Sequence, residues 1–255
     1  MEFRVARAAR VTGELLETLV RQALRAQDIP EPDCVICYGV GYSGTKPALN
    51  AKCSTLNKMQ QGIKLHERLR EEALQIILAQ DAIMMPGNPP LIGRNIQHSK
   101  GRDIRYCRTL RMMNKAIRLG RAYFTPLVDS DTEYRVWVYR KRVLSVYEKR
   151  LTEPENNTKF GRNRANGWTF HALGTEEIPE SVRMVAKKAV AALNLDFGAV
   201  DILGKWEDEA HTTLHATVLE VNSAPGVANE HRSCIVRLTN RIVCWIANGC
   251  PARTE

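Results

Sequence analysis

The chain has 255 residues, of which 44% are hydrophobic and 25% are charged, as is usual for a globular protein with one large or two small cores. Its formal net charge of +9 favours anionic partners such as nucleotides, nucleic acid or an acidic acceptor. No apolar run approaches the roughly 20 residues that span a bilayer, and the start of the chain lacks the apolar core of a signal peptide. We therefore expect a cytoplasmic protein without a membrane partner.

In the first half of the chain, hydrophobic periodicity predicts a mixture of helices and strands. Apolar residues at helical spacing predict a helix over 13–27, and a strand is expected at 34–38. A long helix is expected near 55–80, and the breaker Gly87-Asn-Pro-Pro90 then marks a lobe boundary. The expected elements that follow are strands near 91–95 and 103–108, a helix near 109–119 and a strand at 122–127.

In the second half, alternating polar and apolar residues predict an antiparallel pair of strands at 134–139 and 142–147. Residues 152–166 are polar and typical of a loop. A helix near 179–193, two strands around Asp201 and Glu220, and a last helix near 229–247 complete the pattern. This mixture indicates an α+β or α/β fold.

The seven cysteines are an odd number in a long chain, which argues against a disulfide framework. Cys34 and Cys37 form one CxxC inside an expected strand, where residues three apart face opposite sides. Since no second CxxC follows, buried structural thiols are favoured over a zinc or redox site.

Two late apolar runs contain residues of the types that bind hard metal ions. The first run, 200–203, predicts a buried strand interrupted by Asp201. The second places Glu220 and Asn222 on one face of a strand, because side chains alternate along β-structure. If the strands pair, Asp201 joins them, and three oxygen ligands suit Mg²⁺ holding nucleotide phosphates. Ordinary salt bridges to lysine or arginine explain the same buried carboxylates equally well.

Two glycine-containing segments are candidates for phosphate binding. The first, Gly39-Val-Gly41-Tyr-Ser-Gly44, fits the dinucleotide pattern GxGxxG, but the next acidic residue is Glu67, beyond the spacing of about 20 residues that a ribose ligand needs. It also departs from a P-loop, so a loop facing a substrate is preferred. The second candidate runs from Arg94 through the basic turn at 98–102, which could close over phosphates or be an ordinary basic hairpin.

The order of these pieces resembles the ATP-grasp superfamily, especially its branch of ribosomal-protein glutamate ligases with phage-encoded members. The resemblance covers about residues 58–227. Its most specific part is Asp201 followed by Glu220-x-Asn222-x-x-Pro225-Gly226. The strand Glu133-Tyr-Arg135 and the loop Arg162-Asn163 add weaker matches in the right order.

The resemblance implies an α+β ATP-grasp fold whose two lobes enclose a nucleotide. The implied units are an N-terminal α/β segment at 1–86, a small lobe at 87–127 and a large lobe at 128–255. It also implies ATP and Mg²⁺ as cofactors, with Mn²⁺ as an alternative ion. The metal ligands would be Asp201, Glu220 and Asn222.

Other roles follow from the same resemblance. An early family lysine corresponds to Lys58 or Lys64, and Arg94 stands where the family usually has a lysine, which changes the geometry at constant charge. The implied nucleotide ligands are Arg94 on the α- and β-phosphates, Ser99, Lys100, Gly101 and Arg102 as a flap, Phe124, Thr125 and Leu127 along adenine, and Glu133 on the ribose. The implied catalytic residues, around the transferred phosphoryl group, are Lys149 or Arg150, together with Arg162 and Asn163.

The implied reaction is ATP-dependent, ADP-forming joining of a carboxylate to an amine through an acyl phosphate. The acceptor is left open between an amino acid, a peptide, a protein tail and a modified nucleic acid, and the positive charge suits an acidic or nucleic-acid-linked one. Two alternatives are a basic nucleic-acid-binding protein and an ATP-grasp kinase that stops at phosphoryl transfer. Monomer and homo-oligomer both remain open.

Overall fold

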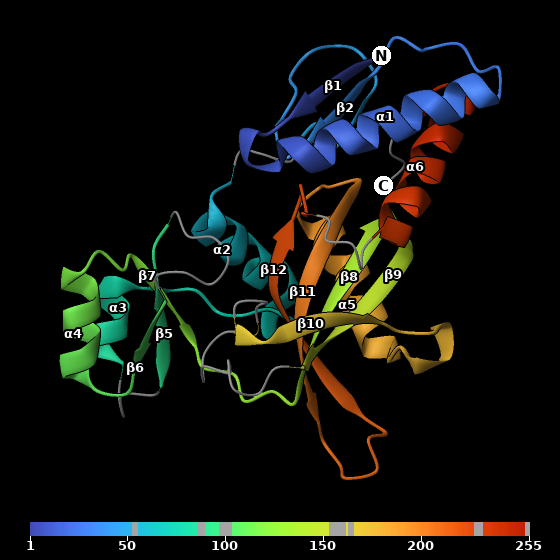
Figure 1. Ribbon diagram of the computed structural model, residues 1–255. Helices are drawn as coiled ribbons and strands as arrows, with labels where there is room; N and C mark the ends of the chain where they lie inside the picture. Colours follow the sequence, from blue (N-terminus) through green and yellow to red (C-terminus); the bar gives the residue numbers. More distant parts are fainter. Residues whose placement is uncertain are drawn as a thin grey trace.

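The computed structural model describes residues 1–52, 56–85, 90–96, 104–152, 162, 166–226 and 232–252. These residues form three sheets, each linked to helices of its own (Figure 1). The mixture of helix and sheet agrees with the α+β expectation. No helix in the described part of the chain combines the length and the apolar character needed to cross a membrane.

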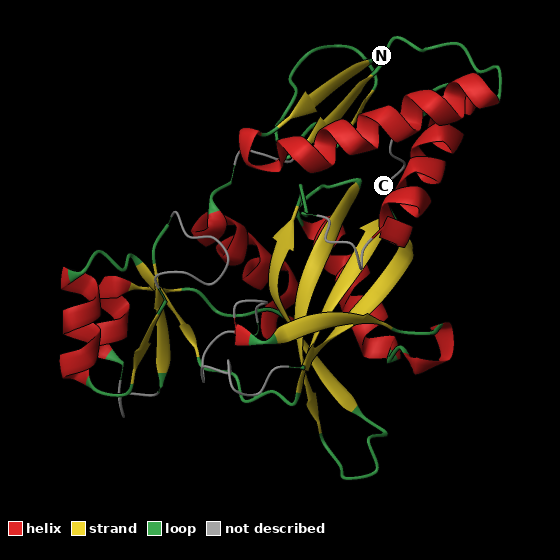
Figure 2. Ribbon diagram, viewed as in Figure 1, coloured by secondary structure: helices red, strands yellow, loops and turns green. Residues whose placement is uncertain are grey.

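The N-terminal unit is a parallel sheet in the order β1-β2-β3, with a long helix packed beside it (Figure 2). Its elements are β1 (Glu2–Val5), α1 (Arg10–Ala26), β2 (Val35–Tyr38) and β3 (Ala48–Leu49). The helix α1 contacts α6 (Arg232–Ala247), so the two ends of the chain share one core. Periodicity predicted α1, β2 and α6, whereas β1 and β3 are too short to leave a pattern.

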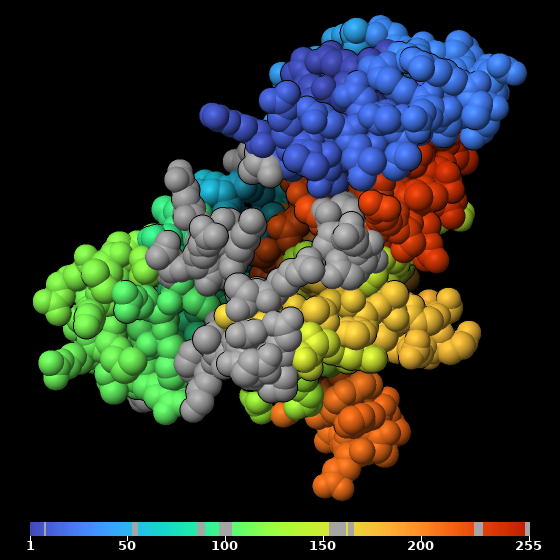
Figure 3. Space-filling view, viewed as in Figure 1, coloured from blue at the N-terminus to red at the C-terminus, as the bar shows by residue number. Residues whose placement is uncertain are grey.

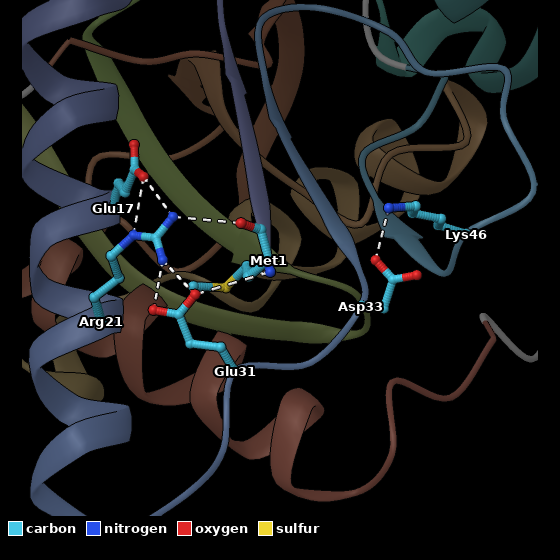
Figure 4. A network of polar contacts seen from close by, with 6 residues as sticks. All are labelled: Met1, Glu17, Arg21, Glu31, Asp33 and Lys46. Atoms are coloured by element: carbon cyan, nitrogen blue, oxygen red, sulfur yellow. Dashed lines mark hydrogen bonds and ion pairs between the residues drawn. The ribbon is translucent and has the colours of Figure 1, made fainter.

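A polar network on the surface holds this unit together (Figure 4). The guanidinium of Arg21 on α1 donates to Glu17 at 2.9 Å and Glu31 at 2.5 Å, and to the carbonyl oxygen of Met1 at 3.3 Å. A separate pair joins Lys46 and Asp33 at 2.7 Å. The Arg21 network therefore fastens the first residue, the helix and the loop before β2 to one another.

The long helix expected near 55–80 is much shorter in the structure. The helix α2 (Lys58–Leu69) begins with a capping box formed by Asn57 and Gln60, and it ends where Arg70 takes a φ of 53°. A 3₁₀ turn (Arg70–Glu72) and β4 (Ile77–Leu78) follow. The prediction was wrong in extent because apolar residues continue past the helix end into the same core.

The small lobe is an antiparallel sheet in the order β4-β7-β5-β6, covered by two helices. Its elements are β4, α3 (Ala79–Met84), β5 (Leu91–Arg94), β6 (Arg105–Cys107), α4 (Leu110–Arg118) and β7 (Tyr123–Pro126). Its core contains Ile77 and Ala82, which precede the expected boundary at residue 87, together with Phe124 and Met113. The sheet therefore begins ten residues earlier than the breaker indicates.

The large lobe is an antiparallel sheet in the order β10-β9-β8-β11-β12. Its elements are β8 (Thr132–Tyr139), β9 (Arg142–Leu151), β10 (Trp168–Ala172), α5 (Glu180–Ala192), β11 (Phe197–Trp206) and β12 (Leu214–Asn222). The β8–β9 hairpin confirms the predicted antiparallel pair, and β10 was not predicted. One face of the sheet packs on α5 and α2, and the other on α6 and the N-terminal unit.

Candidate functional site

Three oxygen-bearing side chains meet on one face of the large sheet. The register places Asp201 of β11 opposite Glu220 of β12, and a bulge follows Asp201. The amide nitrogen of Asn222 lies 3.1 Å from Glu220 Oε1 and 3.3 Å from Asp201 Oδ2. The side chains thus converge as strand alternation predicts, while their role as metal ligands stays a prediction.

Asp201 is paired with an arginine on the strand at its other side. Arg135 of β8 donates through Nε to Oδ1 at 2.7 Å and through Nη2 to Oδ2 at 2.8 Å. Asp201 is 3% exposed. Burial acts to raise the pKa of this carboxyl, but Arg135, Lys149 and Lys58 outweigh it and hold the pKa at about 2. The carboxylate is therefore ionised at every physiological pH.

Glu220 and Asn222 are bridged by an ammonium group from α2. Lys58 Nζ lies 2.6 Å from Glu220 Oε2 and 3.3 Å from Asn222 Oδ1. Burial acts to raise the pKa of Glu220, and the charge of Lys58 lowers it below its usual value. A cation already lies between two of the three predicted ligands, so the donor set suits a positive ion. Among the described residues no three His, Cys, Asp or Glu side chains gather as a metal cluster, so Asn222 is needed to complete a set of three.

A second buried charge pair lies on the neighbouring strands. Lys149 of β9 forms an ion pair with Glu133 of β8, and its ammonium lies 5.4 Å from the centre of the Phe170 ring. Burial and the nearby Asp201 raise the pKa of Glu133, while Lys149 partly offsets this effect. Arg150, next to Lys149, points the other way and pairs with Glu148 at 2.7 Å. The structure therefore brings Lys149 to the site and leaves Arg150 outside it.

Arg162 is the described member of the predicted Arg-Asn loop. Its guanidinium lies over the Trp168 ring at 5.2 Å, and Nη2 donates to the carbonyl oxygen of Ser130 at 2.5 Å. Its Nη1 is buried without a hydrogen bond to any described residue. A buried arginine nitrogen that no described residue hydrogen-bonds suits an anionic ligand.

A cavity separates the small lobe from the large one and reaches Glu220. The small lobe contributes Arg94, Tyr123 and Thr125 to its wall, while Glu220 comes from β12. Arg94 Nε lies 3.4 Å from Thr125 Oγ1. The remaining lining residues come from α2, the segment after it and β12: Lys58, Gln61, Gly62, Leu65, Ala73, Leu74, Ile76, Val218 and Leu219. Arg94, a predicted phosphate ligand, and Glu220, a predicted metal ligand, thus border one space.

The other residues predicted to bind the nucleotide do not line this cavity with their side chains, or lie outside the described residues. Phe124 is buried in the core of the small lobe, so only its backbone could meet a ligand. Leu127 is 37% exposed, and its backbone N–H donates to Pro90 at 3.0 Å. The predicted flap, Ser99, Lys100, Gly101 and Arg102, and the predicted catalytic Asn163 lie outside the described residues.

The glycine loop after β2 packs against the exit of β12. Tyr38 donates its hydroxyl to the carbonyl oxygen of Pro225 at 2.5 Å. Gly39 has a φ of +77°, and a Cβ there would lie 2.7 Å from the Cβ of Ala224. The first glycine of the GxGxxG pattern therefore serves a close approach to the segment after Asn222, and no helix begins at Gly44.

Sequence reasoning missed two cations of the site or left them open. The prediction for Lys58 was shared with Lys64, and the structure brings Lys58 to Glu220. Arg135 was noticed only as part of a motif, yet it is the direct partner of Asp201. Its position two residues after Glu133 on the same strand was a usable signal, since both side chains face the same side.

Comparison with solved structures identifies the fold. The ATP-grasp ligase PsnB, complexed with a phosphomimetic variant of minimal precursor, Mg and ADP, superposes with a TM-score of 0.66 at 11% identity, over 95% of this chain and 97% of that one. The macrocyclase MdnC of Microcystis aeruginosa MRC, bound with the precursor peptide MdnA, gives 0.62 at 10% identity, over 97% and 99%. The D-alanine–D-alanine ligase of Bacillus anthracis gives 0.57 at 12% identity, over 97% and 98%. The chain has the ATP-grasp fold.

A weaker likeness exists at the level of sequence. A probable alpha-L-glutamate ligase of Klebsiella pneumoniae (strain 342) is 25% identical over 166 residues, which are 65% of this chain and 53% of that protein. The match thus spans about half the length of this curated relative. No protein-family model matches the chain.

Proposed function

We propose that this protein is an ATP-dependent, ADP-forming ligase that joins a carboxylate to an amine. The observation that carries the proposal is the convergence of Asp201, Glu220 and Asn222 beside the cavity between the lobes. The ATP-grasp fold and the likeness to a probable glutamate ligase support the same reaction class. Neighbouring structures that contain ADP, Mg or AMPPNP support ATP and Mg²⁺ as ligands.

We assign the cavity between the lobes to ATP. Arg94 would contact the α- and β-phosphates, because a guanidinium donates to phosphate oxygens in a forked geometry. The backbone from Phe124 through Thr125 to Leu127 would follow the adenine edge. The flap at 99–102 completes this assignment on the strength of the family resemblance.

Asp201, Glu220 and Asn222 would hold Mg²⁺, with Mn²⁺ as the alternative ion. When bound, the ion would neutralise charge on the phosphate oxygens and align them. Lys58 now contacts Glu220 and Asn222, so it would have to change partners when ion and nucleotide arrive. The phosphate oxygens of ATP are acceptors of the kind that an ammonium group requires.

In the proposed reaction, an oxygen of the substrate carboxylate attacks the γ-phosphorus of ATP, and the bond to ADP breaks. The amine then attacks the acyl carbon, loses a proton and displaces inorganic phosphate as the amide forms. The first step brings two anions together, and the second develops negative charge on the acyl oxygen and the leaving phosphate, so Lys149, Arg162 and Asn163 would act by neutralising and aligning charge. Glu133 of β8, the ion-pair partner of Lys149, would bind the ribose hydroxyls.

The test is a thermal-shift measurement with Mg–ATP, followed by ADP release in the presence of amino-acid carboxylates and amines. We expect Mg–ATP to raise the melting temperature of the wild type, because a ligand that binds only the folded state stabilises it. Glu220→Gln should lose most of this shift and lower ADP formation by about 10²-fold or more. Glu209→Gln, an exposed carboxylate on the β11–β12 hairpin, is the matched control and should behave as the wild type.

An unchanged melting temperature with Mg–ATP, or full ADP formation by Glu220→Gln, would contradict the proposal. ADP release that needs the carboxylate but never forms an amide would instead assign the protein as a kinase of the same fold.

A further inference from the structure

The positive charge of this chain is concentrated in one stretch of sequence. Residues 77–126, which span the small lobe, contain nine lysines and arginines and two acidic residues, Asp81 and Asp103, so this stretch carries +7 in a chain whose net charge is +9. The remaining four-fifths of the chain is close to neutral. The positive field of the protein therefore originates in the small lobe.

Helix geometry gathers part of this charge on one face. Arg111, Lys115 and Arg118 follow one another along α4 at intervals of four and three residues, so they share its outer face and span about 10 Å. Arg108 and Arg105 lie just before the helix, and all five side chains are exposed. None of the five forms an ion pair with a described residue. We call this set the basic face.

Apolar side chains lie along one edge of the basic face. Met112 on α4 and Leu119, the residue that caps its C-terminal end, are 41% and 46% exposed and lie within about one helical turn of Lys115 in sequence. Met84, at the end of the neighbouring helix α3, is 81% exposed. A helix surface that offers cations and exposed methionine or leucine together fits a partner with carboxylates and apolar groups.

The same surface fits a nucleic acid less well. Binding of single strands combines cations with aromatic rings on which bases stack. Tyr106 is the aromatic residue nearest the basic face in sequence, and the Arg108 guanidinium already covers its ring at 4.8 Å. Charge and apolar contact together therefore favour a peptide over a phosphodiester chain.

We propose that the basic face of α4 binds an acidic peptide segment in which Asp or Glu alternates with apolar residues. The helix lies on the outer side of the small lobe, away from the large sheet that carries Asp201 and Glu220 (Figures 1 and 3). A segment bound there would be recognised apart from any group that reacts. The idea that the bound segment carries the acceptor group of the reaction rests on the proposed function. Binding of the acidic peptide to α4 does not.

The test is direct binding of fluorescein-labelled peptides, measured by anisotropy on the full chain without nucleotide. The probes are a twelve-residue peptide of alternating Glu and Leu, a twelve-residue poly-Glu peptide and a twelve-nucleotide oligo-dT. The variant Arg111→Gln/Lys115→Gln/Arg118→Gln removes three charges from the basic face. The control Arg25→Gln/Lys141→Gln/Arg142→Gln removes three exposed charges elsewhere, so the two variants have equal net charge.

We expect the Glu-Leu peptide to bind in a salt-dependent manner, and the α4 variant to weaken it by about tenfold or more. The control variant should retain the affinity of the wild type. Met112→Ser/Leu119→Ser should weaken the Glu-Leu peptide and leave poly-Glu unchanged.

Equal losses in the α4 variant and its control would overturn the proposal, because binding would then follow net charge alone. Tighter binding of oligo-dT than of the Glu-Leu peptide, lost in the α4 variant, would reassign the face to nucleic acid. Since no probe is turned over, these outcomes are independent of the Mg–ATP measurement.

Discussion

The Lys58 ammonium lies 2.6 Å from Glu220 Oε2, although the two residues come from different elements and are 162 positions apart. The same nitrogen lies 3.3 Å from Asn222 Oδ1. It thus neutralises Glu220 and donates to Asn222, two of the three side chains that we assign to the metal. A divalent ion in that place would compete with the lysine for the same oxygens.

Lys58→Met should therefore affect the free protein and ion binding in opposite directions. We expect its free energy of unfolding to fall by about 1–3 kcal/mol, because the partly buried Glu220 loses its cation. Mn²⁺ should bind the variant more tightly without nucleotide, as measured by electron paramagnetic resonance of free Mn²⁺. Lys64→Met, on the same helix, is the control, and equal Mn²⁺ affinity in both variants would contradict the competition.

Arg135 should be essential for stability as well as for the site. Arg135→Met leaves the buried carboxylate of Asp201 without its bidentate partner, so we expect a loss of about 3–5 kcal/mol in urea unfolding. Arg135→Met combined with Asp201→Asn removes both charges and should recover part of this loss. A double variant less stable than the single one would show that the pair does not act as a unit.

The paired Asp201 also predicts how stability depends on pH. Its pKa is held at about 2 in the folded protein, below the value of about 3.9 in an unfolded chain. The stabilisation from the ionised group is therefore complete above about pH 4 and is lost as the pH falls toward 2. The difference in unfolding free energy between wild type and Asp201→Asn should shrink by about 2–3 kcal/mol over that window. Chemical unfolding at steps between pH 6 and 2 checks it, and a constant difference would contradict the assigned pairing.

The close contacts of Gly39 predict that a side chain at this position disturbs packing against Ala224, which lies far along the chain. In Gly39→Ala the new Cβ would lie 2.7 Å from Ala224 and 2.9 Å from Ala6, at a φ that alanine rarely adopts. We expect a loss of about 1–3 kcal/mol in thermal unfolding. Gly226→Ala, whose Cβ would meet nothing within 4 Å, should change stability little.

The strand pattern predicted much of the metal candidate because alternation is a local rule. Glu220 and Asn222 share a face in any strand, and the pairing of β11 with β12 then brings in Asp201. Strand alternation could not predict the cations that pair with these side chains, because Lys58 lies on α2 and Arg135 on β8. Contacts between distant segments leave no periodic signal in the chain.

The sequence pattern predicted the positions of the long helices, but it did not always predict where they end. The apolar spacing that identifies α2 continues past Leu69, while Arg70 turns the backbone out of the helix with a φ of 53°. Ala73 still packs in the same core, so hydrophobicity alone gives no sign of the change. Short elements such as β3 and α3 were missed because two to six residues do not define a period.

Two short connecting segments join the small lobe to the large lobe. On the way in, Ala73 forms a bridge with Val218 and Leu74 N–H donates to Val218 at 3.0 Å, so only residues 75 and 76 separate the part fixed to β12 from β4. On the way out, Asp131 N–H bonds to Gly204 at 2.9 Å, which fixes the start of β8. Leu127 N–H bonds to Pro90 within the small lobe, so a rotation of the lobe would use torsions in residues 75–76 and 128–130, and Arg94 and Thr125 would move together over Glu220.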